Sequence, residues 1–213
     1  YGGHTTNALI GAAFGMRPGL RARFRLIAKI GIVMASSPGN PRGVQHYDLS
    51  VEHLQHAWNE TLIALDTDHV ETLMLHRFDP LLQPAAIADW VREEQREGRI
   101  GDFGVSNFDP HALALFDGHL PVVANQIELS LANFNVLDDG THAATRARDA
   151  EVQAWSPLGG GDLLDPHSQT GSRLHEPLRT MGGEFGLDPA SLLLRWVASL
   201  PATRVVIGST KIE

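Results

Sequence analysis

The stretch Leu73-Met74-Leu75-His76-Arg77-Phe78-Asp79-Pro80 decides the expected fold, because an apolar run ends abruptly in polar residues. Two later stretches have the same form: residues 104–108 read GVSNF and residues 154–161 read AWSPLGGG. Buried parallel strands that present functional residues at their carboxyl ends have this form. Residues 205–211, VVIGSTK, are a fourth example. We therefore expect an α/β fold, a (β/α)8 TIM barrel with its active site at the carboxyl ends of the strands.

Apolar runs and helical periodicity alternate along the whole chain, as in a parallel α/β fold. An open doubly wound sheet also fits this alternation, but its usual G-x-G-x-x-G turn after the first strand is absent. We expect one partial barrel domain over residues 1–213, with about six of the eight strands. The expected strands are 24–32, 70–75, 100–105, 122–126, 152–155 and 205–208, and the expected helices are 51–65, 84–97, one opening at 109–110, 137–150, 174–185 and one opening at 188–189.

Composition narrows the function classes. The chain has 213 residues, a net charge of −8 and no basic cluster, which argues against nucleic acid as a partner. No apolar run approaches the roughly 20 residues of a membrane span, so we expect no membrane partner. Cysteine is absent, which excludes disulfides and thiolate chemistry, and the eleven histidines are scattered without a metal-binding spacing. We expect an enzyme with a small-molecule substrate and no bound metal.

Three residues near strand ends suggest acid–base chemistry. Lys29 interrupts the apolar run LIAKIGI, and a lysine in a buried strand needs a partner or a function. A nearby ammonium lowers the pKa of a tyrosine from about 10, which makes the phenol a usable proton donor. Tyr1 stands where a neighbouring strand would end, and His76 can orient a carbonyl or relay the proton. Taken singly, each also has an ordinary interpretation: Tyr1 as a frayed terminus, Lys29 as a lysine that snorkels to the rim, and His76 as a structural histidine.

Groups at the other strand ends suit a flat ring that bears an amide. Hydroxyl and amide side chains can bind a carboxamide, and Trp155 offers a face for stacking. The run Gly159-Gly160-Gly161 lets the backbone approach a pyrophosphate closely, and barrels often bind phosphate after their last strand. Each feature alone is also typical of an ordinary turn, a core tryptophan or a flexible loop. The carboxamide candidates are Ser106, Asn107, Asn125 and Gln126, and the phosphate candidates are Ser209, Thr210 and Lys211.

With these motifs in this order, the chain resembles the aldo-keto reductase family, near a bacterial subgroup with a similar His-Arg-x-Asp-Pro strand end. The resemblance covers essentially all 213 residues. It implies reduction of aldehyde or ketone carbonyls by hydride transfer from NADPH, in the cytoplasm. We also expect Lys29, His76, Asn107, Gln126 and Trp155 to converge on the carboxyl-terminal face of the barrel, because all five lie at or near expected strand ends. The resemblance assigns Tyr1, Lys29 and His76 to catalysis, and Ser106, Asn107, Gln126, Trp155, Ser156, Leu158, Gly160, Ser209, Thr210 and Lys211 to the cofactor.

Two parts of the family pattern are missing. The family has an Asp a few residues before the catalytic Tyr, and usually an Arg that holds the 2′-phosphate of NADPH; this chain begins at Tyr1 and ends at Glu213. We expect either a longer natural protein or a true fragment that lacks two strands, the final helix and the substrate loop. Two other functions remain open: a nicotinamide-binding module without turnover, and a barrel that uses Lys29 to form a Schiff base. GVSNF argues against the last. The sequence indicates neither the substrate nor the oligomeric state.

Overall fold

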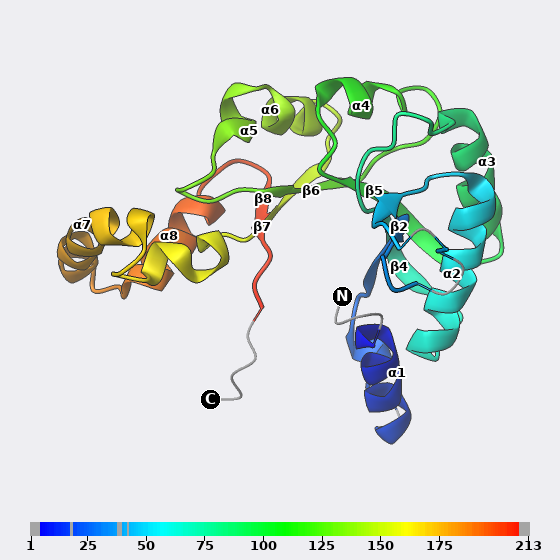
Figure 1. Ribbon diagram of the computed structural model, residues 1–213, viewed down its shortest axis with the longest axis horizontal. Coiled ribbons are helices and arrows are strands. Elements are labelled where there is room, and N and C mark those ends of the chain that lie inside the picture. Colours follow the sequence, from blue (N-terminus) through cyan, green and yellow to red (C-terminus); the bar gives the residue numbers. More distant parts are fainter. Residues whose placement is uncertain (1–4, 18, 38–39, 42, 209–213) are drawn as a thin grey trace. The chain divides into compact units, whose positions relative to one another are not determined.

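A computed structural model of the chain describes residues 5–17, 19–37, 40–41 and 43–208. The chain divides into two compact units, Tyr1–Val123 and Ala124–Glu213. Each unit contains three parallel strands with helices between them (Figure 1). The fold is that of an incomplete (β/α)8 barrel.

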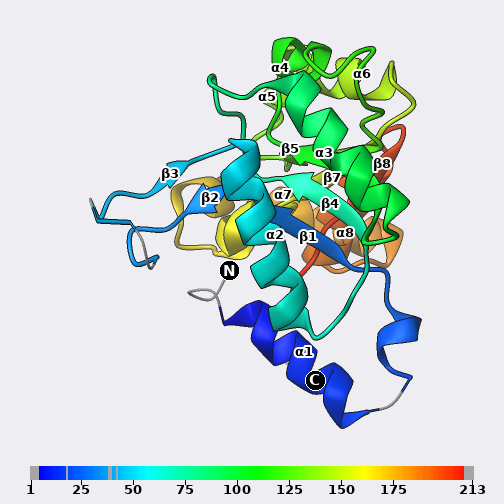
Figure 2. The same ribbon diagram turned by 90° about the vertical axis from the view of Figure 1, so that its right-hand side faces the viewer.

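The first unit is built on the strand order β1-β4-β5. The strand β4 has the predicted bounds, and its register aligns Lys29 with Met74 and Met74 with Gly104. A short antiparallel hairpin, β2 with β3, follows β1 (Figure 2). The elements are α1 (Thr6–Met16), η2 (Arg21–Arg23), β1 (Ile27–Ile30), β2 (Ile32–Val33), β3 (His46–Tyr47), α2 (Val51–Leu65), β4 (Val70–Leu75), α3 (Pro84–Arg96), β5 (Ile100–Ser106) and α4 (Pro110–Ala114).

Helix α2 begins where its sequence predicts. The Ser50 hydroxyl accepts a hydrogen bond from the backbone N–H of His53 at 3.3 Å, which satisfies one of the free N–H groups of the first turn. Its apolar stripe is buried, with Trp58 and Leu54 fully inaccessible. The cap and the buried stripe together determine where this helix begins and which of its sides packs.

A buried carboxylate joins α2 to α3. Glu94 on α3 is 4% exposed and accepts hydrogen bonds from the indole N–H groups of Trp58 (2.9 Å) and Trp90 (3.0 Å). Arg99, just before β5, donates to the same carboxylate at 2.6 Å. A buried charge is tolerated only with such partners, so this cluster ties two helices to the start of a strand.

The second unit has the strand order β6-β7-β8. One face of these strands carries an apolar cluster that includes Ile127, Val152, Ala154 and Val197 of α8. The elements are β6 (Ala124–Glu128), α5 (Asn135–Asp138), α6 (Thr141–Arg146), β7 (Glu151–Trp155), η3 (Gly159–Leu164), α7 (Gln169–Phe185), α8 (Pro189–Ala198) and β8 (Thr203–Val205).

Several predicted elements differ from the observed ones. The single helix expected over 137–150 is two short helices, because Gly140 has a φ of 88° and interrupts the helical backbone. The last strand lies at 203–205 rather than 205–208, and the strand expected over 24–32 is reduced to β1 and β2. Helix α1 and the β2–β3 hairpin were not predicted.

Candidate active site

Lys29 and His76 lie on the same face of the first unit's sheet. Lys29 is aligned with Met74, and the ladder continues through the bond from the His76 N–H to the Ile30 carbonyl at 2.9 Å. Side chains alternate along a strand, so residue 76 points to the same side as residue 74 and therefore as Lys29. Phe103 points to the opposite side of this sheet, where its ring packs against that of Phe116 at an interplanar angle of 51°. The face that carries Lys29 and His76 is thus opposite the one that this aromatic pair covers.

The His76 imidazole is held neutral. Burial, together with the positive charges of Lys29 and Arg77, lowers its pKa from 6.5 to about 4. A neutral imidazole can donate one hydrogen bond and accept another at neutral pH. His76 is therefore suited to orient a carbonyl group rather than to act as a cation.

Tyr47 of β3 packs against His76 and was missed in the sequence. The two rings meet edge to face, with centroids 6.1 Å apart and an interplanar angle of 76°. Its only sequence signal was an aromatic residue three positions before a helix N-cap, which is too weak to indicate a contact with a residue 29 positions away.

Ser106 and Asn107 end β5 as a linked pair. Ser106 is fully buried, and its hydroxyl accepts a hydrogen bond from the Asn107 side-chain amide at 2.9 Å. Asn107 has a φ of 58°, in the left-handed region that asparagine tolerates better than most residues. This turn redirects the chain at the strand end and places a half-buried amide side chain there, which suits the binding of a carboxamide.

Four predicted site residues lie outside the described residues: Tyr1, Ser209, Thr210 and Lys211. Their roles stay predictions.

In the second unit, Gln126 and Trp155 share one face. Gln126 is aligned with Gln153, and Glu128 with Trp155, so all four side chains point away from the apolar cluster of α8. Gln126 is 7% exposed, and Trp155 is half-buried. A buried amide and a partly accessible indole on one face are compatible with a flat ring that bears a carboxamide.

Asn125 corrects one expectation. Its side chain points to the opposite face, where the amide donates to the Thr145 hydroxyl of α6 at 3.2 Å. Asn125 is fully buried there and belongs to the packing between β6 and α6, not to the carboxamide candidates.

The glycine run after β7 forms a turn with left-handed backbone at successive residues. Gly160 has a φ of 66° and Gly161 of 101°, and a Cβ at either position would meet no atom within 4 Å. Ser156 has a φ of 51°, and its carbonyl accepts from the Gly159 N–H at 2.8 Å. Leu158 is half-buried, and its carbonyl accepts from the Gly161 N–H at 3.0 Å. The backbone of this loop is open to a close approach by a phosphate group, so the residues present fit a dinucleotide.

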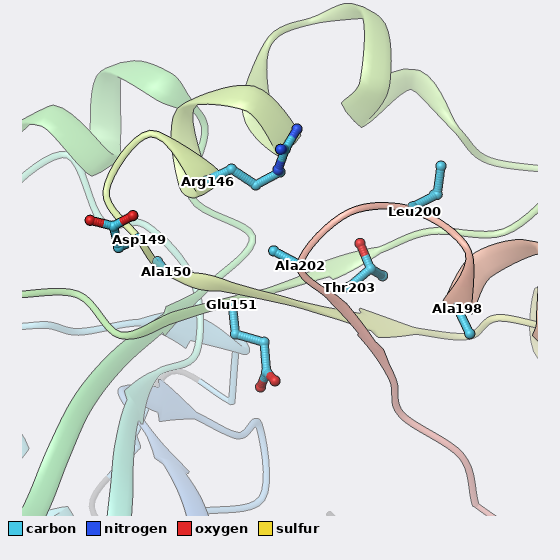
Figure 3. A pocket seen from close by; sticks show the side chains of 8 residues that line it. All are labelled: Arg146, Asp149, Ala150, Glu151, Ala198, Leu200, Ala202 and Thr203. Atoms are coloured by element: carbon cyan, nitrogen blue, oxygen red, sulfur yellow. The ribbon is translucent and has the colours of Figure 1, made fainter.

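Two cavities among the described residues bear on where the site lies. One of about 580 Å³ lies at the amino ends of β7 and β8, beside Arg146, Glu151 and Thr203 (Figure 3). Because barrel active sites form at the carboxyl ends of strands, we do not assign the site to this cavity. The other, of about 490 Å³, lies in the first unit between the loops that follow β1 and β4, and Tyr47 and Asp79 line it.

Asp79 holds the walls of this second cavity together. One carboxylate oxygen accepts from the Leu49 N–H at 3.1 Å, and the other from the Leu81 N–H at 2.9 Å. The loops after two neighbouring strands are thereby fixed to each other on the side where Tyr47 contacts His76.

The described part of the chain contains no cluster of three potential metal-ligating side chains. Among the helices in those ranges, none has the length and apolar character needed to cross a bilayer.

A further missed feature is the polar row beside Gln126. Glu151 and Gln153 alternate with Val152 and Ala154 along β7, a period-2 pattern that indicates one polar and one apolar face. That alternation could have identified Gln153 as a neighbour of the site, because polar residues on the inner face of a barrel strand need partners.

Known proteins share this architecture and sequence pattern. The model of the Aldo/keto reductase family matches residues 1–213. An uncharacterised oxidoreductase, YcsN of Bacillus subtilis, is 34% identical over 100% of this chain and 72% of its own length. A 6-dehydroglucose reductase of Agrobacterium fabrum is 32% identical with the same coverage. The crystal structure of an aldo/keto reductase from Klebsiella pneumoniae in complex with NADP and acetate has a TM-score of 0.75 and 22% identity, over 97% of this chain and 66% of that one. The chain belongs to the aldo/keto reductase family of oxidoreductases.

Proposed function

We propose that the protein is an NADPH-dependent reductase of aldehydes or ketones, with Tyr1 as the proton donor. The observation that carries the proposal is the placement of Lys29 and a neutral His76 on one sheet face, within electrostatic range of each other. The likeness to the Klebsiella structure solved with NADP is one of fold and is consistent with the cofactor proposed. That residues 1–213 form a single barrel domain, and that the protein is cytoplasmic, remain parts of this proposal.

Each residue has a distinct role in the proposed reaction. The nicotinamide, when bound, supplies the hydride. The His76 imidazole donates a hydrogen bond to the carbonyl oxygen and orients it, while the Tyr1 phenol gives that oxygen its proton. The Lys29 ammonium stabilises the phenolate that the transfer leaves behind.

The proposed cofactor contacts follow the family resemblance. We propose that Ser106, Asn107 and Gln126 bind the carboxamide and that Trp155 stacks on the ring. The backbone of Ser156, Leu158 and Gly160 would hold the pyrophosphate. Ser209, Thr210 and Lys211 would bind the 2′-phosphate, which favours NADPH over NADH. Equal affinity of the intact protein for both dinucleotides would contradict this last assignment.

The test is a comparison of rate with cofactor affinity in the intact protein. We expect Tyr1→Phe and Lys29→Met each to lower the reduction rate by about 10²–10⁴-fold and to leave NADPH affinity nearly unchanged. Arg25→Met, which removes an exposed positive charge near the start of β1, is the control and should retain both. Sugar-derived aldehydes are the first substrates to assay, because one relative is named for such a substrate.

A Tyr1→Phe variant that keeps more than about a tenth of the wild-type rate would remove Tyr1 from the mechanism. If NADPH binds but no carbonyl compound is reduced, the protein is a cofactor-binding module instead.

A further inference from the structure

A row of polar side chains crosses the second unit's sheet on the face that carries Gln126. The Gln126 amide nitrogen donates to the Gln153 carbonyl oxygen at 3.0 Å, and the Gln153 amide nitrogen donates to Glu151 at 2.9 Å. The Arg204 Nε donates to the other oxygen of Glu151 at 2.7 Å. The register supports the row, because Gln126, Gln153 and Arg204 are aligned on three neighbouring strands.

The chemistry of these side chains fixes which group donates and which group accepts at each step along the row. A carboxylate only accepts hydrogen bonds, so Glu151 requires the nitrogen of the Gln153 amide on its side. The Gln153 oxygen must then face Gln126. Because an amide oxygen can only accept a hydrogen bond, the group of Gln126 that faces it must be the amide nitrogen. The orientation of the Gln126 amide, which could otherwise be turned over, is thereby determined by a carboxylate two side chains away.

Burial makes this orientation costly to change. Gln126 is 7% exposed and Gln153 is 5% exposed, and inverting either amide would bring two donors or two acceptors together out of reach of bulk water. The Arg204 side chain, by contrast, is 72% exposed, so its ion pair with Glu151 contributes little by itself. The decisive pair is therefore Gln153 with Glu151.

We propose that Gln153 is a positioning residue for Gln126, which it holds with its oxygen oriented to accept from a carboxamide N–H. The inference rests on the proposed function, because it assumes that Gln126 contacts the nicotinamide carboxamide. Gln153 itself contacts Gln126 and Glu151 and does not need to touch the cofactor.

The test compares two ligands of the intact protein by fluorescence titration: NADPH, and 2′,5′-ADP, which lacks the nicotinamide half. Gln153→Met keeps the length of the side chain and removes both hydrogen bonds. We expect it to weaken NADPH binding by about fivefold, the size of one hydrogen bond, and to leave 2′,5′-ADP binding unchanged. The variant Gln95→Met, which removes one bond to the Gly101 carbonyl in the first unit, is the matched control and should change neither affinity.

A double-substitution cycle tests whether Gln153 acts through Gln126. The double variant Gln126→Met/Gln153→Met should bind NADPH no more weakly than Gln126→Met alone. Glu151→Gln is a milder second variant at a more exposed position, and it removes the group that fixes the direction of the row. It should weaken NADPH binding by about twofold or more with no effect on 2′,5′-ADP.

Three results would overturn the inference: unchanged NADPH affinity in Gln153→Met, equal losses for both ligands, or additive losses in the double variant. A wild-type protein that binds neither ligand would instead contradict the proposed function. The two failures are therefore distinguishable within one set of titrations.

Discussion

At the scale of single residues, the site combines one neutral base and one cation on the same sheet face. Lys29 and His76 were identified from the sequence because both interrupt or end apolar runs. Lys29 and His76 share a face because of how β1 and β4 are aligned. The sequence alone does not specify that alignment. The contact of Tyr47 with His76 depends on the β2–β3 pairing, which no local pattern of the sequence specifies.

The lowered pKa of His76 makes stability depend on pH. Below pH 6.5 the unfolded chain binds a proton at this histidine, whereas the folded protein does so only near pH 4. The contribution of neutral His76 to the free energy of unfolding is therefore fully present above pH 6.5, and it is lost as the pH falls toward 4. We expect His76→Gln to lose less unfolding free energy than wild type between pH 7.5 and pH 5, as measured by urea unfolding. His111→Gln, at an exposed position, is the control; an identical loss in wild type and His76→Gln would contradict the interpretation.

At the scale of elements, side-chain caps were the most reliable sequence signals. Helices α2, α4 and α8 begin at the positions that the sequence predicts, and there Ser50, Asp109 and Asp188 each accept from the N–H three residues later. Prediction failed where the backbone depends on distant contacts or on a single glycine. Helix α1 is apolar on most sides and so lacks the one-sided stripe that identifies a helix, and Gly140 divides a segment whose composition is helical.

Glu94 should be the most sensitive polar position in the contact between α2 and α3. Glu94→Gln removes the charge that faces Arg99 and places an amide N–H among donors from Trp58 and Trp90. We expect it to reduce the unfolding free energy by about 2–4 kcal/mol, because buried donors lose their acceptor. Urea unfolding followed by tryptophan fluorescence measures the loss. Glu93→Gln, an exposed neighbour on the same helix, should change stability by less than about 0.5 kcal/mol, and a similar loss in both variants would argue against the cluster.

At the scale of the whole molecule, the proposed single domain predicts one cooperative unfolding transition. The strands of a (β/α)8 barrel share one interior, so neither unit is expected to unfold alone. The four tryptophans offer a direct measurement: Trp58 and Trp90 belong to the first unit, and Trp155 and Trp196 to the second. Two variants, each with one pair replaced by Phe, report on one unit each. In each variant, the unfolding midpoint from tryptophan fluorescence should equal the midpoint from far-ultraviolet circular dichroism. Different midpoints within one variant would indicate two domains.

The glycine loop after β7 has a consequence for handedness. At Gly160 and Gly161 there is room for a methyl group, yet the backbone adopts torsions that only the mirror image of an ordinary amino acid prefers. An L-alanine in this loop is therefore disfavoured by its chirality and not by its size. A D-alanine introduced at either position by chemical synthesis would fit the space and match the torsions. By restricting the unfolded chain, it would stabilise the same turn that L-alanine strains.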